Sequence, residues 1–84
     1  FVLEEQGEGR WRMTGNVWLE DFRREHPALE RAPGVDTIGG LITSRLDAIP
    51  AVDTEVEFSG LIFRVTRADD RRVLEVLAKT KGGK

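Results

Sequence analysis

Polar and apolar residues alternate with a period of two along the last third of the chain, as expected for strands with one buried face. Ser59-Gly60 and Asp69-Asp70 interrupt this alternation at the spacing of tight turns. Such short connections predict a three-stranded antiparallel meander. Its strands are expected over residues 54–58, 61–67 and 71–78. The side chains predicted to face the core are Val56, Phe58, Leu61, Phe63, Val65, Leu74 and Val76.

The first third of the chain combines one strand with one short helix. Trp11 lies in an alternating stretch that predicts a strand with the tryptophan on its inner face. Leu19 and Phe22 then open a helix over residues 19–25. The helix is expected to finish at His26, because a residue that precedes a proline avoids the α region. As the only histidine, His26 is interpreted as a surface residue at a helix end rather than as a catalytic group or a ligand.

A second helix is predicted over residues 37–46, and it contains two adjacent glycines. Asp36 or Thr37 can cap its first turn. Gly39 and Gly40 each cost about 1 kcal/mol relative to alanine inside a helix. Gly39 lies at the border of the apolar stripe, so close packing on the sheet explains it, whereas Gly40 lies opposite, where we expect another segment or a partner to approach. The stripe consists of Ile38, Leu41, Ile42, Leu46 and Ile49.

The predicted architecture follows from the need to cover the meander. A sheet with one apolar face requires a second layer, and the two amphipathic helices can supply it. With the N-terminal strand added to the sheet, the fold class is α+β and the order of elements is βααβββ. Residues 1–9 are expected to be a linker remnant of a longer protein, residues 10–78 the domain, and residues 79–84 a flexible tail.

Composition removes several classes of function. The chain has 84 residues, a net charge of −2 and a pI near 5.4, which gives no reason to expect a nucleic-acid partner. Without cysteine it has no disulfide and no thiolate metal site. The longest apolar runs are too short for a membrane span or for the core of a signal peptide. No catalytic motif is recognisable, so we predict no catalytic residues.

The string Asp-Thr-Ile-Gly-Gly at residues 36–40, followed by Ile49-Pro50, resembles the CorC/HlyC transporter-associated domain. The resemblance covers about residues 10–78. Thr14 stands where the family commonly has an aspartate, and Ala51-Val52-Asp53 follows Pro50 where the family often has Pro-x-Gly-Asp or Pro-x-Gly-Glu. Other positions that fit the family are Trp11, Gly15, Leu19, Phe22, Leu46, Phe58, Phe63-Arg64-Val65 and Arg71-Arg72-Val73.

This resemblance implies a context and a role. Such domains resemble cytoplasmic C-terminal modules of bacterial inner-membrane proteins, which follow a pair of CBS domains and an integral membrane domain. Those proteins are hemolysin-like or linked to magnesium and cobalt efflux. The implied role is non-catalytic regulation or docking that modulates transport of divalent cations or other ions, with no cofactor, and homo-oligomerisation stays open. The positions expected to serve structure or partner contact are Trp11, Asp36, Thr37, Gly39 and Gly40.

Two alternatives belong to other classes. The family fold is similar to part of a PCMH-type FAD-binding domain, so a nucleotide- or flavin-binding module is one, with Trp11 or Trp18 as a stacking residue. We expect no flavin binding, because 84 residues supply only one of two subdomains and no glycine-rich phosphate loop. The other is a divalent-cation sensor using Asp69, Asp70 and Glu75. Only weak cation binding is expected, because Ca²⁺ prefers six or more oxygen ligands.

Overall fold

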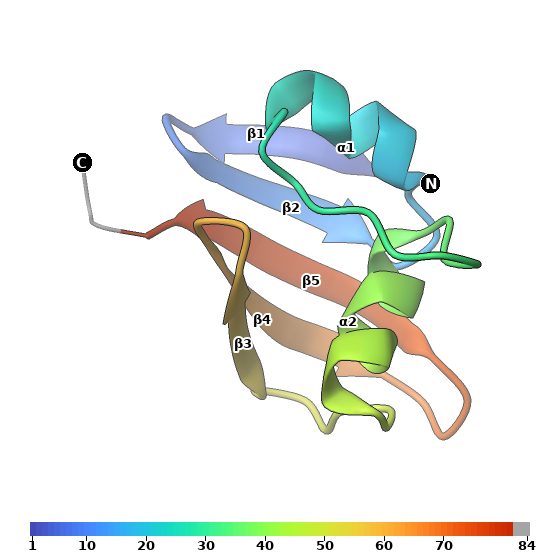
Figure 1. Cartoon of the computed structure of the whole chain (residues 1–84). Coiled ribbons are helices and arrows are strands. Elements are labelled where there is room, and N and C mark those ends of the chain that lie inside the picture. Colours follow the sequence, from blue (N-terminus) through green and yellow to red (C-terminus); the bar gives the residue numbers. More distant parts are fainter. Residues whose placement is uncertain (82–84) are drawn as a thin grey trace.

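A computed structural model, which describes residues 1–81, forms a five-stranded antiparallel sheet with two helices on one face (Figure 1). The strands lie in the order β1-β2-β5-β4-β3. This arrangement confirms the predicted α+β class and places the two helices as the expected cover. The elements are β1 (Leu3–Gly7), β2 (Arg10–Thr14), α1 (Leu19–Glu25), α2 (Ile38–Leu46), β3 (Glu55–Phe58), β4 (Leu61–Ala68) and β5 (Val73–Thr80).

The structure corrects the predicted domain boundaries at both ends of the chain. Residues 1–9 are not a linker, because β1 pairs with β2 as an edge strand and Leu3 lies opposite Met13. Its polar side chains hide this role, since an edge strand can be held by backbone hydrogen bonds alone. The expected tail also begins too early, because β5 continues through Thr80, and Lys79 pairs with both neighbouring strands. Residues 82–84 of that predicted tail lie outside the described residues.

The meander of β3, β4 and β5 is confirmed, with one change in which side chains face inward. Val65 lies opposite Val76, but the register then shifts twice before Ala68 meets Val73. At these shifts Thr66 of β4 and Leu74 of β5 have no partner in the opposite strand, so Val73 is buried and Leu74 is only half-buried. The prediction that Leu74 faces the core is therefore wrong, because alternation fails at a bulge.

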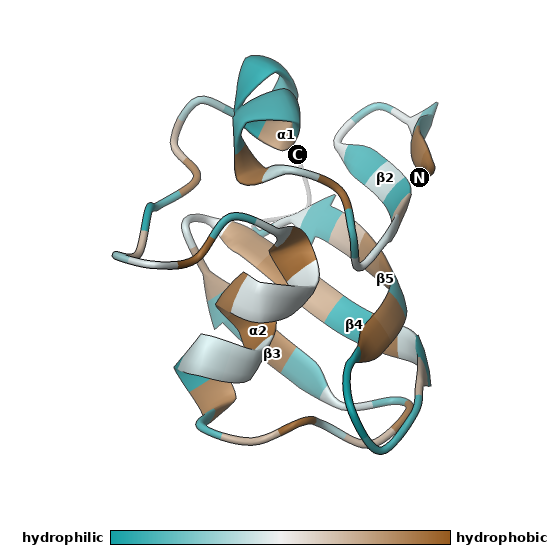
Figure 2. Ribbon diagram, turned by 90° about the vertical axis from the view of Figure 1, so that its right-hand side faces the viewer, coloured by the Kyte–Doolittle hydropathy of each residue, from teal (hydrophilic) through white to brown (hydrophobic). Residues whose placement is uncertain are grey.

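The core lies between the sheet and the helices. Trp11 packs edge-on against Phe22 of α1, with ring centroids 5.2 Å apart. Phe22 in turn meets Phe63 of β4 at 6.5 Å, so one aromatic cluster joins α1 to both halves of the sheet. Figure 2 shows the hydrophobic positions concentrated in α2 and the strands, and a hydrophilic connection between β4 and β5. The fully buried large side chains include Met13, Leu29, Ile38, Leu41, Ile42, Leu61, Val17, Val65 and Val76.

His26 ends α1 as predicted, but it does not stand freely on the surface. Its ring is half-buried, stacked on Phe22 at 6.2 Å, and its Nε2 lies 2.8 Å from the carbonyl oxygen of Ser59. Because a carbonyl only accepts, Nε2 carries the proton in this contact. His26 thus ties the end of α1 to the turn between β3 and β4, which is a structural role.

Candidate functional site

The two glycines of α2 lie where the helix starts on the sheet. A Cβ built on Gly39 would lie 3.0 Å from the carbonyl oxygen of Gly15 and 3.3 Å from that of Val73. A Cβ on Gly15 would lie 2.0 Å from the same Val73 oxygen. Gly39 also donates its N–H to the Gly15 carbonyl at 2.9 Å. Close approach of three backbones therefore explains Gly39, as the helical wheel predicts, and it also explains Gly15.

The backbone N–H groups in the first turn of α2 already donate hydrogen bonds to acceptors within the protein. Thr37 is the N-cap, and its Oγ1 accepts a hydrogen bond from the Gly40 N–H at 3.1 Å. The N–H of Ile38 donates to Val17, and the N–H of Gly39 to Gly15. Asp36 contributes through its backbone, since its carbonyl accepts from Leu19 at 2.7 Å. The free N–H groups that make a helix start attractive to anions are therefore already used.

A groove of about 740 Å³ runs beside this helix start, between α2 and the connection from β4 to β5. Its floor contains Gly39 and Gly40, and Arg71 and Arg72 stand on the opposite side. Among residues 1–81, no aspartate or glutamate lines it. The lining is completed by Thr14, Gly15, Asn16, Thr37, Thr43, Ser44, Val73 and Leu74.

Asp69 organises the arginine side of this groove. Its Oδ1 accepts hydrogen bonds from the backbone N–H groups of Arg71 and Arg72, at 2.8 and 2.9 Å. These two hydrogen bonds lower the pKa of the Asp69 carboxyl below its usual range. Asp69 and Asp70 were the candidates for a metal site, and the structure gives Asp69 a role in the turn. Residues 1–81 contain no group of three or more histidine, aspartate or glutamate side chains placed to hold a metal ion.

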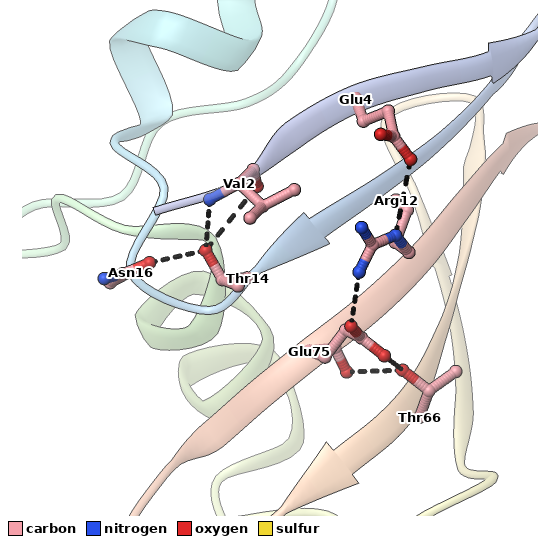
Figure 3. A network of polar contacts seen from close by, with 7 residues as sticks. All are labelled: Val2, Glu4, Arg12, Thr14, Asn16, Thr66 and Glu75. Atoms are coloured by element: carbon pink, nitrogen blue, oxygen red, sulfur yellow. Dashed lines mark hydrogen bonds and ion pairs between the residues drawn. The ribbon is translucent and has the colours of Figure 1, made fainter.

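The face of the sheet opposite the helices carries a ladder of polar side chains (Figure 3). Arg12 lies between Glu4 and Glu75, with its Nη1 2.9 Å from Glu75 Oε2 and its Nε 3.4 Å from Glu4 Oε1. The Thr66 hydroxyl donates to Glu75 Oε1 at 2.8 Å. The Thr66 hydroxyl, together with Arg12, lowers the pKa of Glu75, and Glu75 raises the pKa of Arg12. The ladder fixes side chains on four neighbouring strands, so this open face is ordered.

At the centre of the same open face lies a small apolar hollow. Ile62 and Leu77 form its floor, and both are half-buried without a helix above them. Arg10, Arg64 and Lys79 stand around it, and the hollow has a volume of about 180 Å³, enough for one side chain. Apolar surface framed by charged groups is typical of a protein interface.

The structure separates the residues that the sequence singled out. Trp11 is 6% exposed and so serves the core, not a partner. Thr37 and Gly40 line the groove, and Gly39 is buried beneath it. Trp18 is 55% exposed, so of the two tryptophans it alone is accessible to a ligand. The alternation that placed Trp11 inward could also have pointed to Arg12 on the open face.

Three comparisons identify related proteins. The family model described as "Transporter associated domain" (CorC_HlyC) matches residues 4–82. The chain is 32% identical over 69 residues to the magnesium and cobalt efflux protein CorC of Escherichia coli K12, covering 82% of this chain and 24% of that protein. A CorC-associated region from Neisseria meningitidis MC58 superimposes with a TM-score of 0.86 and 31% identity, covering 93% and 96% of the two chains.

A second solved structure extends the match to nearly the whole chain. The CorC_HlyC domain of Nitrosomonas europaea has a TM-score of 0.82 and 25% identity, and the alignment covers 96% of this chain and 98% of that one. Within residues 1–81, neither helix is long and apolar enough to cross a membrane. The agreement of sequence and fold shows that this chain belongs to the CorC/HlyC transporter-associated domain family.

Proposed function

We propose that this domain is a non-catalytic regulatory and docking module of a larger bacterial membrane protein. The larger protein would move divalent cations such as Mg²⁺ and Co²⁺, or other ions, and this module would lie on the cytoplasmic face of the inner membrane. The main support comes from the curated relative, an efflux protein of which the aligned region is only 24%. We therefore propose that the domain acts through contacts with the rest of that larger protein.

The open face of the sheet is the proposed contact surface. Its apolar floor of Ile62 and Leu77 is small, and the ladder through Arg12 orders charged side chains on the same face. Such a surface can bind and release a neighbouring domain more easily than a large apolar interface can. We propose a preceding pair of CBS domains as the neighbour. Docking there would let the module favour one state of the transporter over another.

The test uses the full-length protein in membrane vesicles. Leu77→Arg adds a charge to the centre of the open face, and Val52→Arg is the matched control, because Val52 is 50% exposed in a loop. Mg²⁺ and Co²⁺ transport is measured over a range of concentrations, with circular dichroism of each isolated domain as a check of folding. We expect Leu77→Arg to change the transport rate and Val52→Arg to leave it unchanged. Transport that survives both Leu77→Arg and deletion of the module unaltered would reject the proposal.

A further inference from the structure

We propose that the groove between α2 and the β4–β5 connection binds an acidic peptide segment, with carboxylates of that segment paired to Arg71 and Arg72. This inference rests on the proposed function in one respect, since we take the segment to belong to the same larger protein. It concerns a different surface, because the groove lies on the helical side and the proposed domain contact lies on the open face of the sheet.

Charge is the first argument. The whole chain has 15 acidic residues against 13 lysines and arginines, yet within residues 1–81 the lining of this groove contains two arginines and no acid. Both arginines are exposed. Neither guanidinium forms an ion pair with any residue of the described part, whereas six other basic residues do so. Apart from the Asp69 carboxylate of the same turn, which interacts with Arg72, the groove therefore presents two positive charges that an acidic ligand can pair with.

Preorganisation is the second argument. Asp69 holds the backbone of Arg71 and Arg72 through its carboxylate, and its own N–H donates to the Arg72 carbonyl at 3.0 Å. The turn that carries both arginines is thus closed on itself. A ligand then orders only the arginine side chains, which lowers the entropic cost of binding.

Within the described part of the chain, the groove has no helix-start phosphate site, so a ligand would be held by the two guanidinium groups, which pair with carboxylates and phosphates alike. A phosphate site at a helix start uses free backbone N–H groups, but those of Ile38, Gly39 and Gly40 are already bonded within the protein. The planar guanidinium fork remains, and it matches a carboxylate with two parallel hydrogen bonds.

The shape of the floor favours a peptide. Gly40, Thr43 and Ser44 line the α2 side of the groove, so only small side chains stand between a bound segment and the helix. Ser44 lies one turn further along the groove, and its side chain is exposed. An extended acidic segment laid along α2 would therefore meet small residues on one side and the two guanidinium groups on the other.

The first experiment uses the isolated domain, since the Neisseria and Nitrosomonas relatives were solved as chains of nearly this extent. The chain has no cysteine, so Ser44→Cys provides a single site for a fluorescent label in the groove. Hexaglutamate is the probe, with inorganic phosphate and hexalysine for comparison. We expect a saturable response to hexaglutamate alone, weakened at least about tenfold by Arg71→Glu with Arg72→Glu. The matched control is Arg24→Glu with Arg31→Glu, which changes the net charge equally outside the groove.

Several results of that titration would overturn the inference. They are the absence of a response, a weakening in the charge-matched control equal to that in Arg71→Glu with Arg72→Glu, or tighter binding of phosphate than of hexaglutamate. The unlabelled domain with the same substitutions is melted in parallel, so a loss of folding is seen separately from a loss of binding.

The second experiment finds the occupant in the full-length protein, in a background without other cysteines. If the groove is filled, a maleimide labels Ser44→Cys more slowly there than in the isolated domain, and Arg71→Glu with Arg72→Glu restores the rate. A cross-linker at the same position should then capture an acidic segment of the same polypeptide. Equal labelling rates, or capture of the groove of a second copy, would refute the inference. Transport need not change in this test, so its failure is distinct from failure of the proposed regulatory function.

Discussion

Alanine at Gly39 and alanine at Gly40 should have different effects, although the two residues are adjacent in one helix. The new Cβ at Gly39 would meet backbone atoms, the carbonyl oxygens of Gly15 and Val73, at 3.0 and 3.3 Å. Those atoms cannot move unless the end of β2 and the start of β5 move with them. The new Cβ at Gly40 would meet side-chain atoms instead, Thr37 Oγ1 at 3.1 Å and Val35 Cγ1 at 3.4 Å. Side chains can rotate by the few tenths of an ångström required.

The magnitudes follow from these contacts. Replacing glycine by alanine inside a helix gains about 1 kcal/mol at either position. At Gly39, overpacking costs about 1–3 kcal/mol, so we expect a net destabilisation of about 1 kcal/mol. At Gly40, the cost is a weakened Thr37 cap, worth about 1 kcal/mol at most, so the net change should lie within about 0.5 kcal/mol of zero. The two variants should therefore differ by about 0.5–1.5 kcal/mol.

Denaturant and thermal melts of the isolated domain, with sedimentation of each variant, test this reasoning. For a domain of this size, 1 kcal/mol corresponds to a shift of about 4–8 °C in Tm, well within measurement. A Gly39→Ala domain as stable as the parent would show that the backbones can separate at no cost. A Gly40→Ala domain less stable than Gly39→Ala would show that the Thr37 cap, rather than the backbone crossing, limits this part of the fold.

Three further predictions concern neighbouring features. Gly15→Ala should cost about 3 kcal/mol or more in melts, because its Cβ would lie 2.0 Å from the Val73 oxygen; a smaller loss than for Gly39→Ala would contradict this. Thr37→Ala should cost about 1 kcal/mol by loss of the N-cap, and an unchanged Tm would argue against the cap. The lowered pKa of Glu75 means that its hydrogen bond from Thr66 and its ion pair with Arg12 stabilise the fold above the usual glutamate pKa of about 4.3, and this stabilisation is lost as the pH falls through the lowered value. The difference in unfolding free energy between the parent and Glu75→Gln should therefore shrink from pH 7 to pH 3, and a constant difference would refute it.

Periodicity in the sequence determined most of the elements. The alternation of apolar residues predicted β2, β3 and β4 because a strand buries every second side chain, and that property is local. The helix start at Thr37 could also be predicted, because the N-cap hydroxyl and the N–H group that donates to it are only three residues apart. Gly39 was correctly assigned to close packing, because its angle on the helical wheel depends only on its position in the chain.

Tertiary structure decided the features that depend on distant partners. The strand β1 has no alternation of its own and exists because β2 offers it hydrogen bonds. The bulge that buries Val73 in place of Leu74 arises between two strands, so neither strand alone reveals it. The contact of Arg12 with Glu75 joins residues 63 positions apart. The arginine groove likewise forms only when α2 docks on β5 and brings Gly40 opposite Arg71. Side-chain period is a property of neighbouring residues, so the sequence alone predicted most of the elements. Strand partners, registers and grooves depend on the packing of the whole chain, so only the tertiary structure assembled the site.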